Sequence, residues 1–338
     1  MTQGPEGKRA TIYDVARRAE VSHQTVSRLI KGHSNISPEL RVRIEAAIVE
    51  LNYRPNVTAR NLATRRPDLI AVLTADTSEY GPSQTLLGIT EAARSAGFLV
   101  DVVGVNPADR AELAQAVTLF KSRDLAGIMA IAPADALVAA LEGLSFEAPV
   151  HIWKEADDWL GGGDQTVNAF GQELLIDHLY GLGHRRFTYV SGPEDWISAR
   201  HRSAGVLGAL RRRGLKPVGH AVGDWSARSG YVAVARLPVR DFTALVAAND
   251  QMALGAMLAL EDRGLSVPHD VSVVGFDDLP EAPYYRPPLT TVRQDFVQQG
   301  RIALSRLLSL IERSEAETPK PVTPVLVVRA SSAPPRAT

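Results

Sequence analysis

The sequence contains no cysteine among its 338 residues, and this absence excludes several kinds of site at once. A disulfide framework, a thiolate nucleophile and a zinc ribbon all need cysteine, so packing alone must stabilise the fold. No apolar run approaches the roughly 18 residues that a membrane-spanning helix needs. The N-terminus is polar and lacks the apolar stretch of a signal peptide. We therefore expect a cytoplasmic protein with no membrane partner.

Recognisable catalytic and cofactor motifs are also missing. The sequence has no Ser/His/Asp arrangement, no cluster with metal-ligand spacing and no Gly-Lys-Ser/Thr phosphate loop. An enzyme would have to use Asp250, Asp277 or Asp278 as the paired carboxylates of a glycosidase, and turnover of aryl glycosides would reveal it. We predict a protein that is not an enzyme and that needs no metal and no cofactor.

What the sequence does contain is a charge asymmetry behind a net charge of −1. Residues 1–66 hold 12 Lys and Arg against 6 Asp and Glu, whereas the remainder holds 25 against 32. The length and the 45% hydrophobic content indicate a soluble protein of two or three domains. A basic head on an acidic body suggests that the head binds a polyanion, and chance surface charge is the alternative.

The basic head shows the pattern of three short helices over residues 10–55. Apolar residues recur at helical spacing in a first helix after Thr11, a second after Ser22 and a third after Ser37. Serine is a favoured N-cap, and Pro38 suits the first turn of the third helix. The inward faces comprise Ile12, Val15, Ala16 and Ala19, then Val26, Leu29 and Ile30, then Leu40, Ile44, Ala47, Ile48 and Leu51. Two short helices joined by a tight turn predict a helix-turn-helix.

The outward face of the second helix carries side chains suited to DNA. Gln24 can pair with adenine and Arg28 with guanine in the major groove. Thr25 and Ser27 suit phosphate contacts. A small helical docking module with a polar outer face is the alternative interpretation.

From Leu69 onward, short apolar runs alternate with segments of helical spacing such as 85–96 and 251–263. This alternation predicts an α/β architecture of parallel sheets covered by helices on both faces. The runs are too many for one sheet, so we expect two doubly wound lobes with a ligand at the carboxyl ends of the strands. The predicted buried strands are Leu69–Ala75, Phe98–Val105, Gly127–Ala132, Pro149–Trp153, Phe187–Ser191, Ala244–Ala248 and Val271–Phe276.

Polar and aromatic residues follow several of these strands. Asn249 and Asp250 follow one strand, Asp277 and Asp278 follow another, and Trp225 lies in a Gly-Asp-Trp-Ser run. Such groups bind the hydroxyls and the C–H face of a sugar. An aspartate after a strand is more often a helix cap, however, and a tryptophan more often belongs to the core. An exported sugar-binding protein would share these features, but the basic head argues against it.

Several runs resemble the lactose and galactose repressor (LacI/GalR) family of bacterial regulators. They are ATIYDVARRAEVSHQTVSR at 10–28, ELNYRPN at 50–56, SARHRSAG at 198–205, GDWSA at 223–227, VAANDQMALGAM at 246–257, VSVVGFDD at 271–278 and LTTVRQDF at 289–296. The resemblance implies a helix-turn-helix domain over 10–55, a hinge helix and linker over 56–67, and a two-lobed periplasmic-binding-protein-like domain over 68–330. It also implies a homodimeric repressor that leaves a pseudo-palindromic operator when it binds a sugar, such as a galactoside. A corepressor that strengthens DNA binding is the alternative.

The resemblance also implies which residues make contacts. His23, Gln24 and Arg28 take the base-reading positions, and His23 stands where the lactose-responsive branch carries tyrosine, so the operators can differ. In the hinge, Leu62 would wedge into the minor groove and Ala59 would pack against its dimer mate, although a plain linker is the alternative. The implied DNA contacts are Thr11, Tyr13, Ser22, His23, Gln24, Thr25, Ser27, Arg28, Asn56, Ala59 and Leu62. The implied effector contacts are Pro82, Lys154, Arg202, Trp225, Asn249, Asp277 and Phe296.

Among the implied effector contacts, Lys154 departs from the lactose-responsive branch, which carries aspartate there. A lysine donates hydrogen bonds and cannot accept them, so the effector can differ. Arg202 is expected to donate to two hydroxyls, Asp277 to accept from others, and Trp225 and Phe296 to form the floor of the pocket.

The C-terminal segment 331–338 is rich in serine, proline and alanine and has no leucine heptads. We expect this tail to be disordered. Without a heptad repeat to join dimers, we expect a dimer and not a tetramer.

Overall fold

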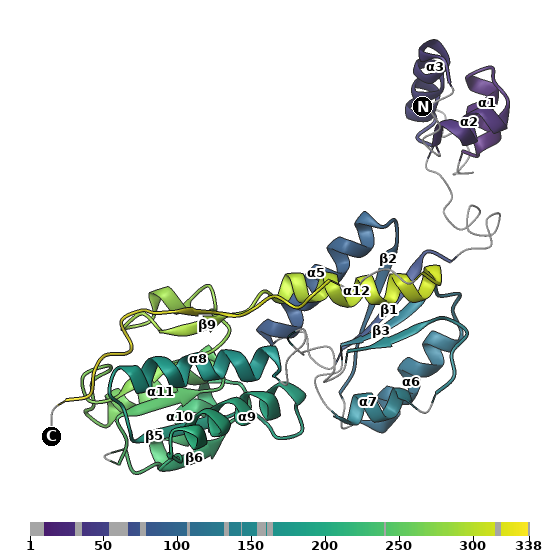
Figure 1. Cartoon of the computed structure of the whole chain (residues 1–338). Helices are drawn as coiled ribbons and strands as arrows, with labels where there is room; N and C mark the ends of the chain where they lie inside the picture. Colours follow the sequence, from purple (N-terminus) through teal and green to yellow (C-terminus); the bar gives the residue numbers. More distant parts are fainter. Residues whose placement is uncertain are drawn as a thin grey trace, which may run out of the picture. The chain divides into compact units, whose positions relative to one another are not determined.

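The computed structural model of the protein describes residues 10–30, 36–53, 67–74, 79–106, 109–131, 135–142, 144–153, 160, 165–239, 241–314 and 319–336. The chain divides into two compact units, Met1–Pro67 and Asp68–Thr338, which are described separately. Element labels follow Figure 1. No helix in these described ranges is both long and apolar enough to span a membrane.

The first unit contains three helices, α1 (Ile12–Arg18), α2 (His23–Ile30) and α3 (Pro38–Glu50). The side chains of Thr11 and Ser37 each accept a hydrogen bond from a backbone N–H three residues further on, which fixes where α1 and α3 begin. The apolar faces pack into one small core, whose fully buried members are Val15, Val26 and Ile44. The predicted helix-turn-helix is confirmed.

The second unit begins with a parallel four-stranded sheet of order β2-β1-β3-β4, which forms lobe 1. Its strands are β1 (Leu69–Thr74), β2 (Leu99–Gly104), β3 (Gly127–Ile131) and β4 (Val150–Ile152). Its helices are α5 (Tyr80–Ser95), α6 (Arg110–Lys121), α7 (Asp135–Glu142) and α12 (Phe296–Glu312). Alternate residues of β1 enter opposite cores: Ile70 and Val72 pack with α5 and α12, and Leu73 packs with α6 and α7.

A second parallel sheet, of order β6-β5-β7-β8, forms lobe 2. Its strands are β5 (Phe187–Ser191), β6 (Gly219–Val222), β7 (Ala244–Ala247) and β8 (Ser272–Val274). Its helices are α8 (Val167–Gly181), α9 (Ile197–Arg212), α10 (Ala227–Arg236) and α11 (Asp250–Asp262). The prediction of two doubly wound lobes is confirmed.

The chain crosses between the lobes three times. It first passes from β4 to α8, and then from β9 (Thr291–Arg293) to α12, which lies beside α5 in lobe 1 (Figure 1). The last crossing leads from α12 to β10 (Val325–Val327), which pairs antiparallel with β9. Lobe 1 is therefore completed by a helix that follows lobe 2 in the sequence.

Three sequence predictions are wrong. The predicted buried strand Pro149–Trp153 contains β4, whose three residues are only half-buried because β4 lies at an edge of its sheet. The predicted buried strand Phe98–Val105 contains β2, an edge strand in which Leu99 is 58% exposed, because such a strand has a neighbour on one side only. The tail predicted to be disordered is described through Arg336 and is docked on lobe 2. Ser331 is fully buried, and its Oγ donates to the Val273 carbonyl at 2.6 Å and accepts from Thr290 N at 2.8 Å. These hydrogen bonds anchor a segment whose composition is typical of disorder.

Candidate functional site

The second helix of the head presents the proposed base-reading residues to solvent. His23, Gln24 and Arg28 are exposed on α2, and Ser27 is half-buried among them. The apolar side chains of the same helix face the core of the head. The polar residues therefore share the outer side of a short, capped helix, as a reader of the major groove requires.

Other proposed DNA contacts hold the helix ends. Ser22 Oγ accepts from Thr25 N at 3.1 Å and lies 2.9 Å from Thr25 Oγ1, and Thr11 caps α1 in the same way. Tyr13 is 61% exposed, and its ring centroid lies 5.1 Å from that of His23. The caps orient α2, while the two rings form one exposed aromatic surface.

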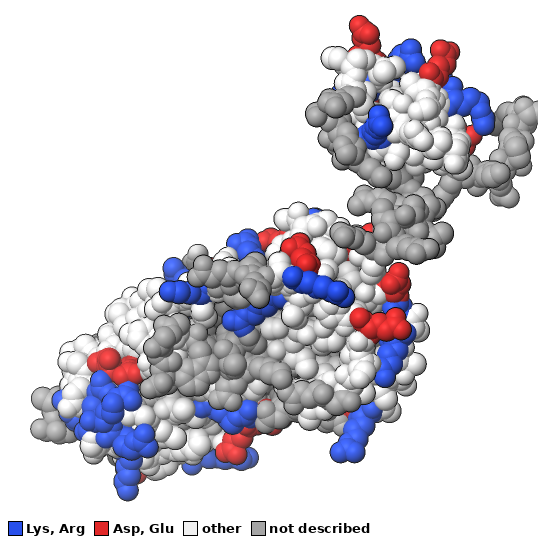
Figure 2. Space-filling view, turned by 45° about the vertical axis from the view of Figure 1, so that its right-hand side comes forward, with Lys and Arg blue, Asp and Glu red and all other residues white. Residues whose placement is uncertain are grey.

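The basic excess of the head lies outside the described helices. The described ranges 10–30 and 36–53 contain five Lys and Arg and five Asp and Glu. The positive balance of residues 1–66 therefore comes from 1–9, 31–35 and 54–66. Asn56, Ala59 and Leu62 also lie in this last range, outside the described residues. On the face of the second unit shown in Figure 2, basic and acidic side chains are interspersed.

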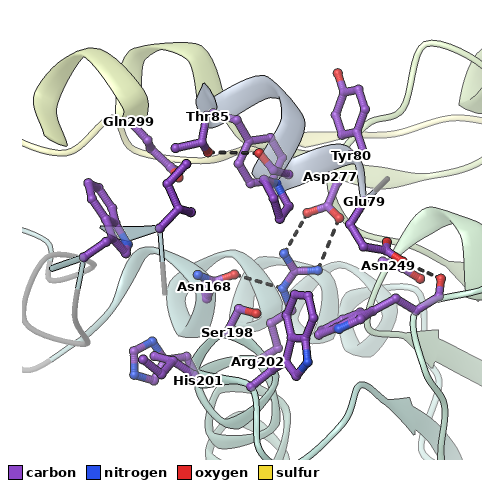
Figure 3. A pocket seen from close by; sticks show the side chains of 18 of the residues that line it. Glu79, Tyr80, Thr85, Asn168, Ser198, His201, Arg202, Asn249, Asp277 and Gln299 are labelled. Atoms are coloured by element: carbon purple, nitrogen blue, oxygen red, sulfur yellow. Dashed lines mark hydrogen bonds and ion pairs between the residues drawn. The ribbon is translucent and has the colours of Figure 1, made fainter. Parts of the chain in front are cut away.

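In the second unit, a cleft opens at the carboxyl ends of the strands of both sheets (Figure 3). Its empty volume is about 900 Å³ when the solvent in its open mouth is included. Five of the proposed effector contacts line it on lobe 2 or at its boundary with lobe 1: Arg202, Trp225, Asn249, Asp277 and Phe296. Pro82 joins them from α5, and Lys154 lies outside the described residues.

A buried ion pair lies on the lobe 2 side of this cleft. Arg202 Nη2 donates to Asp277 Oδ1 at 2.8 Å, and Nη1 donates to Oδ2 at 3.3 Å. Arg202 Nε donates to Asn168 Oδ1 at 2.9 Å, and Nη1 also donates to the Ala248 carbonyl. Gln294 Nε2 donates to Asp277 Oδ1 at 3.2 Å. These four bonds from Arg202 leave one of the five guanidinium N–H groups for a ligand, in contrast to the free fork expected from the sequence.

Burial makes this pair sensitive to the loss of either member. The side chains of Arg202 and Asp277 are 5% and 10% exposed. Burial raises the pKa of Asp277, and the neighbouring guanidinium opposes this rise by favouring the carboxylate. Each charge therefore depends on the other, and the pair forms a fixed polar element in the cleft wall.

Asn249 positions the tryptophan beside the ion pair. Its Oδ1 accepts from Met252 N at 2.9 Å and caps α11, while its Nδ2 donates to the Trp225 carbonyl at 2.9 Å. Trp225 has a φ of +74°, and its ring packs so closely on Gly192 that a Cβ there would lie 2.3 Å away. Its buried Nε1 has no hydrogen-bond partner among the described residues. Asn249 thus lines the cleft with its side chain already bonded to the protein.

Lobe 1 contributes an apolar wall. Phe296, the first residue of α12, is 9% exposed, and its ring meets that of Tyr80 edge-on at a centroid distance of 5.9 Å. A Cβ at Gly81 would lie 3.1 Å from the Phe296 ring, so glycine permits the close approach of α5 to α12. Pro82 continues this wall in the first turn of α5.

The structure adds residues that the sequence reasoning missed. They include Glu79, Tyr80, Trp153, Asn168, Trp196, Ser198, His201 and Gln299. In the view of Figure 3, His201, Asn168 and Gln299 lie on one side of the Arg202–Asp277 pair, and Glu79 and Tyr80 lie on the other. Most of them come from helices and not from the strand ends, where the sequence predicts a ligand site. The one available signal was Trp153, which directly follows β4.

Comparisons with known proteins agree with this arrangement. Residues 11–56 match the family model for bacterial regulatory proteins of the lacI family, and residues 176–332 match the model for periplasmic binding protein-like domains. Over 325 residues the chain is 36% identical to the lactose operon repressor of Escherichia coli (strain K12), covering 95% of this chain and 90% of that protein. The chain belongs to the lacI family.

A second repressor and a solved repressor structure match over a similar share of the chain. The ribose operon repressor of Escherichia coli (strain K12) is 30% identical over 332 residues, covering 96% of this chain and all of that protein. A crystal structure of the lac repressor dimer bound to operator and the anti-inducer ONPF aligns with a TM-score of 0.81 at 34% identity. That alignment covers 96% of this chain and 100% of the other. These relatives are transcriptional repressors, so the chain is a regulatory protein and not an enzyme.

Proposed function

We propose that this chain is a sequence-specific repressor that binds a pseudo-palindromic operator as a homodimer and is released by a small sugar, a galactoside or a related glycoside. A bacterial operator lies in the cytoplasm, where we expect the protein to work. No metal or other cofactor is part of the proposal.

The observation that carries the proposal is the cleft whose walls come from both lobes. Arg202 and Asp277 contribute a buried charged pair from lobe 2, while Pro82 and Phe296 contribute apolar surface from lobe 1. A ligand that touches all four residues would set the angle between the lobes. Since a ligand shifts an equilibrium only through different affinities for two states, a site that spans both lobes suits a switch.

The chemistry of the cleft favours a sugar. Asp277 retains lone pairs that can accept from hydroxyls, and the remaining N–H of Arg202 can donate to one. Trp225 and Phe296 provide flat apolar faces for the C–H side of a pyranose ring. Similarity alone does not name the sugar, because relatives at 36% and 30% identity are repressors of the lactose and ribose operons.

The outer face of α11 supports a homodimer. Leu254 and Leu258 lie one turn apart and are 41% and 51% exposed. An exposed row of large apolar side chains suits a self-complementary interface. Two copies of the head would then read two halves of a palindromic site.

In the head, we propose that Gln24, Arg28 and His23 read bases. We further propose that the hinge segment 56–63, outside the described residues, folds only in the DNA-bound dimer, because eight residues are too few for a stable isolated helix. Sugar binding would favour the lobe arrangement in which the paired hinges separate.

The test begins with selection of an operator sequence by the full-length protein. A labelled operator duplex is then titrated with monosaccharides and disaccharides, and fluorescence anisotropy reports release. A thermal-shift screen identifies the sugar, since a ligand at about 100 times its Kd stabilises by about 2.7 kcal/mol. We expect the sugar that stabilises the protein to lower operator affinity as well.

Linkage provides the deciding control. The factor by which the sugar weakens operator binding must equal the factor by which operator weakens sugar binding. Equal sugar affinities with and without operator would exclude induction. Tighter sugar or purine binding in the presence of operator would establish the corepressor alternative.

A further inference from the structure

Tryptophan is concentrated in the cleft. Of the four tryptophans in the sequence, Trp153, Trp196 and Trp225 line this one cleft. Trp225 packs against the Arg202–Asp277 pair, with the guanidinium carbon 5.3 Å from its ring centroid. One indole beside one charged pair provides what a single sugar ring needs. Trp153 and Trp196 therefore exceed the requirements of one ring.

The angle between Trp196 and Trp225 prevents them from stacking on the same ring face. Their ring centroids lie 5.6 Å apart, and their planes meet at 63°. A pyranose ring stacks with its mean plane nearly parallel to one indole. A ring lying flat on Trp225 would thus not lie flat on Trp196 as well, so stacking on Trp196 requires a different ring.

Trp196 is held in a fixed position at the end of a turn. Its N–H donates to the Pro193 carbonyl at 3.1 Å, and it immediately precedes α9. Its side chain is only half-buried, although it packs against the core of lobe 2. Trp153 is placed similarly in lobe 1, where its N–H donates to the Ala130 carbonyl at 2.9 Å and its side chain is half-buried. Each lobe thus presents a partly exposed indole to the cleft.

Polar side chains accompany these two indoles. Ser198 and His201 lie in the first turns of α9, directly after Trp196, and both line the cleft. Gln299 of α12 lies on the same side of the ion pair as His201 in Figure 3. Hydroxyl, imidazole and amide groups near an aromatic face suit a second ring that bears hydroxyls better than an alkyl or plain aryl group.

We propose that Trp196, with Trp153 facing the cleft from the other lobe, forms a second-ring subsite, so that the effector is a disaccharide and not a monosaccharide. This inference rests on the proposed sugar-responsive function. The first ring lies against Trp225 and the Arg202–Asp277 pair, and the second lies against Trp196. A two-ring ligand contacts both lobes more extensively than one ring does, which increases its differential affinity for one lobe arrangement.

The experiment compares matched sugars by calorimetry on the full-length protein. The pairs are methyl β-D-galactopyranoside with lactose, methyl β-D-glucopyranoside with cellobiose, and methyl α-D-glucopyranoside with maltose. In the pair that binds, we expect the disaccharide to bind about tenfold more tightly, as stacking on one aromatic face allows. Trp196→Leu should remove about tenfold from disaccharide affinity but less than about threefold from the methyl glycoside.

Two further variants separate stacking from damage to the fold. Trp196→Phe keeps a flat face and should restore most of the disaccharide preference. A purely structural role of Trp196 is instead excluded if Trp196→Leu weakens disaccharide binding much more than methyl glycoside binding. Leu207→Ala removes a 48% exposed side chain from the same helix, outside the cleft, and should change neither affinity. Operator binding without sugar reports whether each variant is folded.

The outcomes distinguish the two proposals. If a sugar binds and releases operator but both members of its pair bind equally, or Trp196→Leu weakens both equally, the second-ring subsite is wrong while the proposed function stands. If none of the six sugars binds, the sugar-responsive function and the subsite fail together.

Discussion

Replacing Asp277 by asparagine separates the charge of this side chain from its shape. Asp277 has a φ of +106°, in a region where aspartate and asparagine are tolerated better than alanine. The substitution keeps one acceptor oxygen but replaces the other oxygen with an N–H donor. That donor must face either the Arg202 guanidinium or the Gln294 amide, both of which already donate to this position. The variant therefore loses an ionic hydrogen bond without creating a cavity.

The size of the destabilisation that we expect follows from the burial of the Arg202–Asp277 pair. Because both side chains are at most 10% exposed, solvent cannot replace the lost partner. Losing one hydrogen bond to a charged group costs about 1.5–3 kcal/mol, which we expect for Asp277→Asn. Removing the partner entirely, in Asp277→Ala, should cost about 3–5 kcal/mol. In the sugar complex the lost acceptor should weaken binding by about 1–3 kcal/mol, which is roughly 5- to 150-fold.

The next residue provides a matched control. The side chain of Asp278 is 6% exposed and accepts from Arg293 Nε at 2.7 Å and from Arg329 Nη2 at 2.6 Å, but it does not line the cleft. Asp278→Asn should destabilise the second unit to a similar extent while leaving the sugar response intact. Urea titration measures stability, and anisotropy of labelled operator with added sugar measures release.

Two results would refute this reasoning. If Asp278→Asn abolished release as fully as Asp277→Asn, general destabilisation and not a ligand contact would explain the loss. If Asp277→Asn released operator at the wild-type sugar concentration, Asp277 would not be an acceptor for the effector.

Three further predictions concern other parts of the chain. Arg28→Ala should weaken operator binding by about 1–3 kcal/mol and relax the preference at one base pair per half-site in gel shifts. An equal loss of affinity for all operator variants would instead make Arg28 a phosphate contact. Leu254→Glu should shift sedimentation from dimer to monomer, and an unchanged dimer would place the interface elsewhere. Burial lowers the pKa of His184 below 6.5, so stability declines as the pH falls below 6.5, because the unfolded chain takes up the proton before the buried ring does. Because His184 Nε2 lies 2.9 Å from the Ala333 carbonyl, hydrogen exchange in 331–336 should rise between pH 7.5 and 5.5; constant exchange would contradict this.

The architecture could be predicted because many segments of the sequence repeat the same alternation of apolar runs and helical spacing. Central strands such as β5 and β7 are buried on both faces, and β7 is an unbroken apolar run. The strand β6, in contrast, was not predicted, because its sequence Gly-His-Ala-Val is short and half-exposed. The pair β9 and β10 was also missed, since each strand has three residues and their pairing depends on the returning chain. Local sequence pattern does not predict a strand that forms only by pairing with residues distant in the sequence.

The site was only partly predictable for a related reason. Residues just after strands could be singled out because parallel topology gathers strand ends at one edge. Arg202 and Trp225 do lie at the cleft, but only the structure shows how far their hydrogen-bonding groups are already engaged. Trp196 and His201 gave no signal, because a tryptophan before a helix and a histidine within one are ordinary residues in sequence. Their contact with a ligand stays a prediction.

Asp277 and Asp278 illustrate why adjacent identical residues can have different roles. Both have positive φ, +106° and +56°, so the loop after β8 turns sharply and sends successive side chains to different partners. Asp277 holds Arg202 in the cleft, while Asp278 holds Arg329 of the segment that returns from lobe 1. The same loop therefore contacts both the effector cleft and the last crossing between the lobes. The two neighbouring asparagine variants therefore compare the loss of a cleft contact at Asp277 with the loss of an ion-pair partner outside the cleft at Asp278.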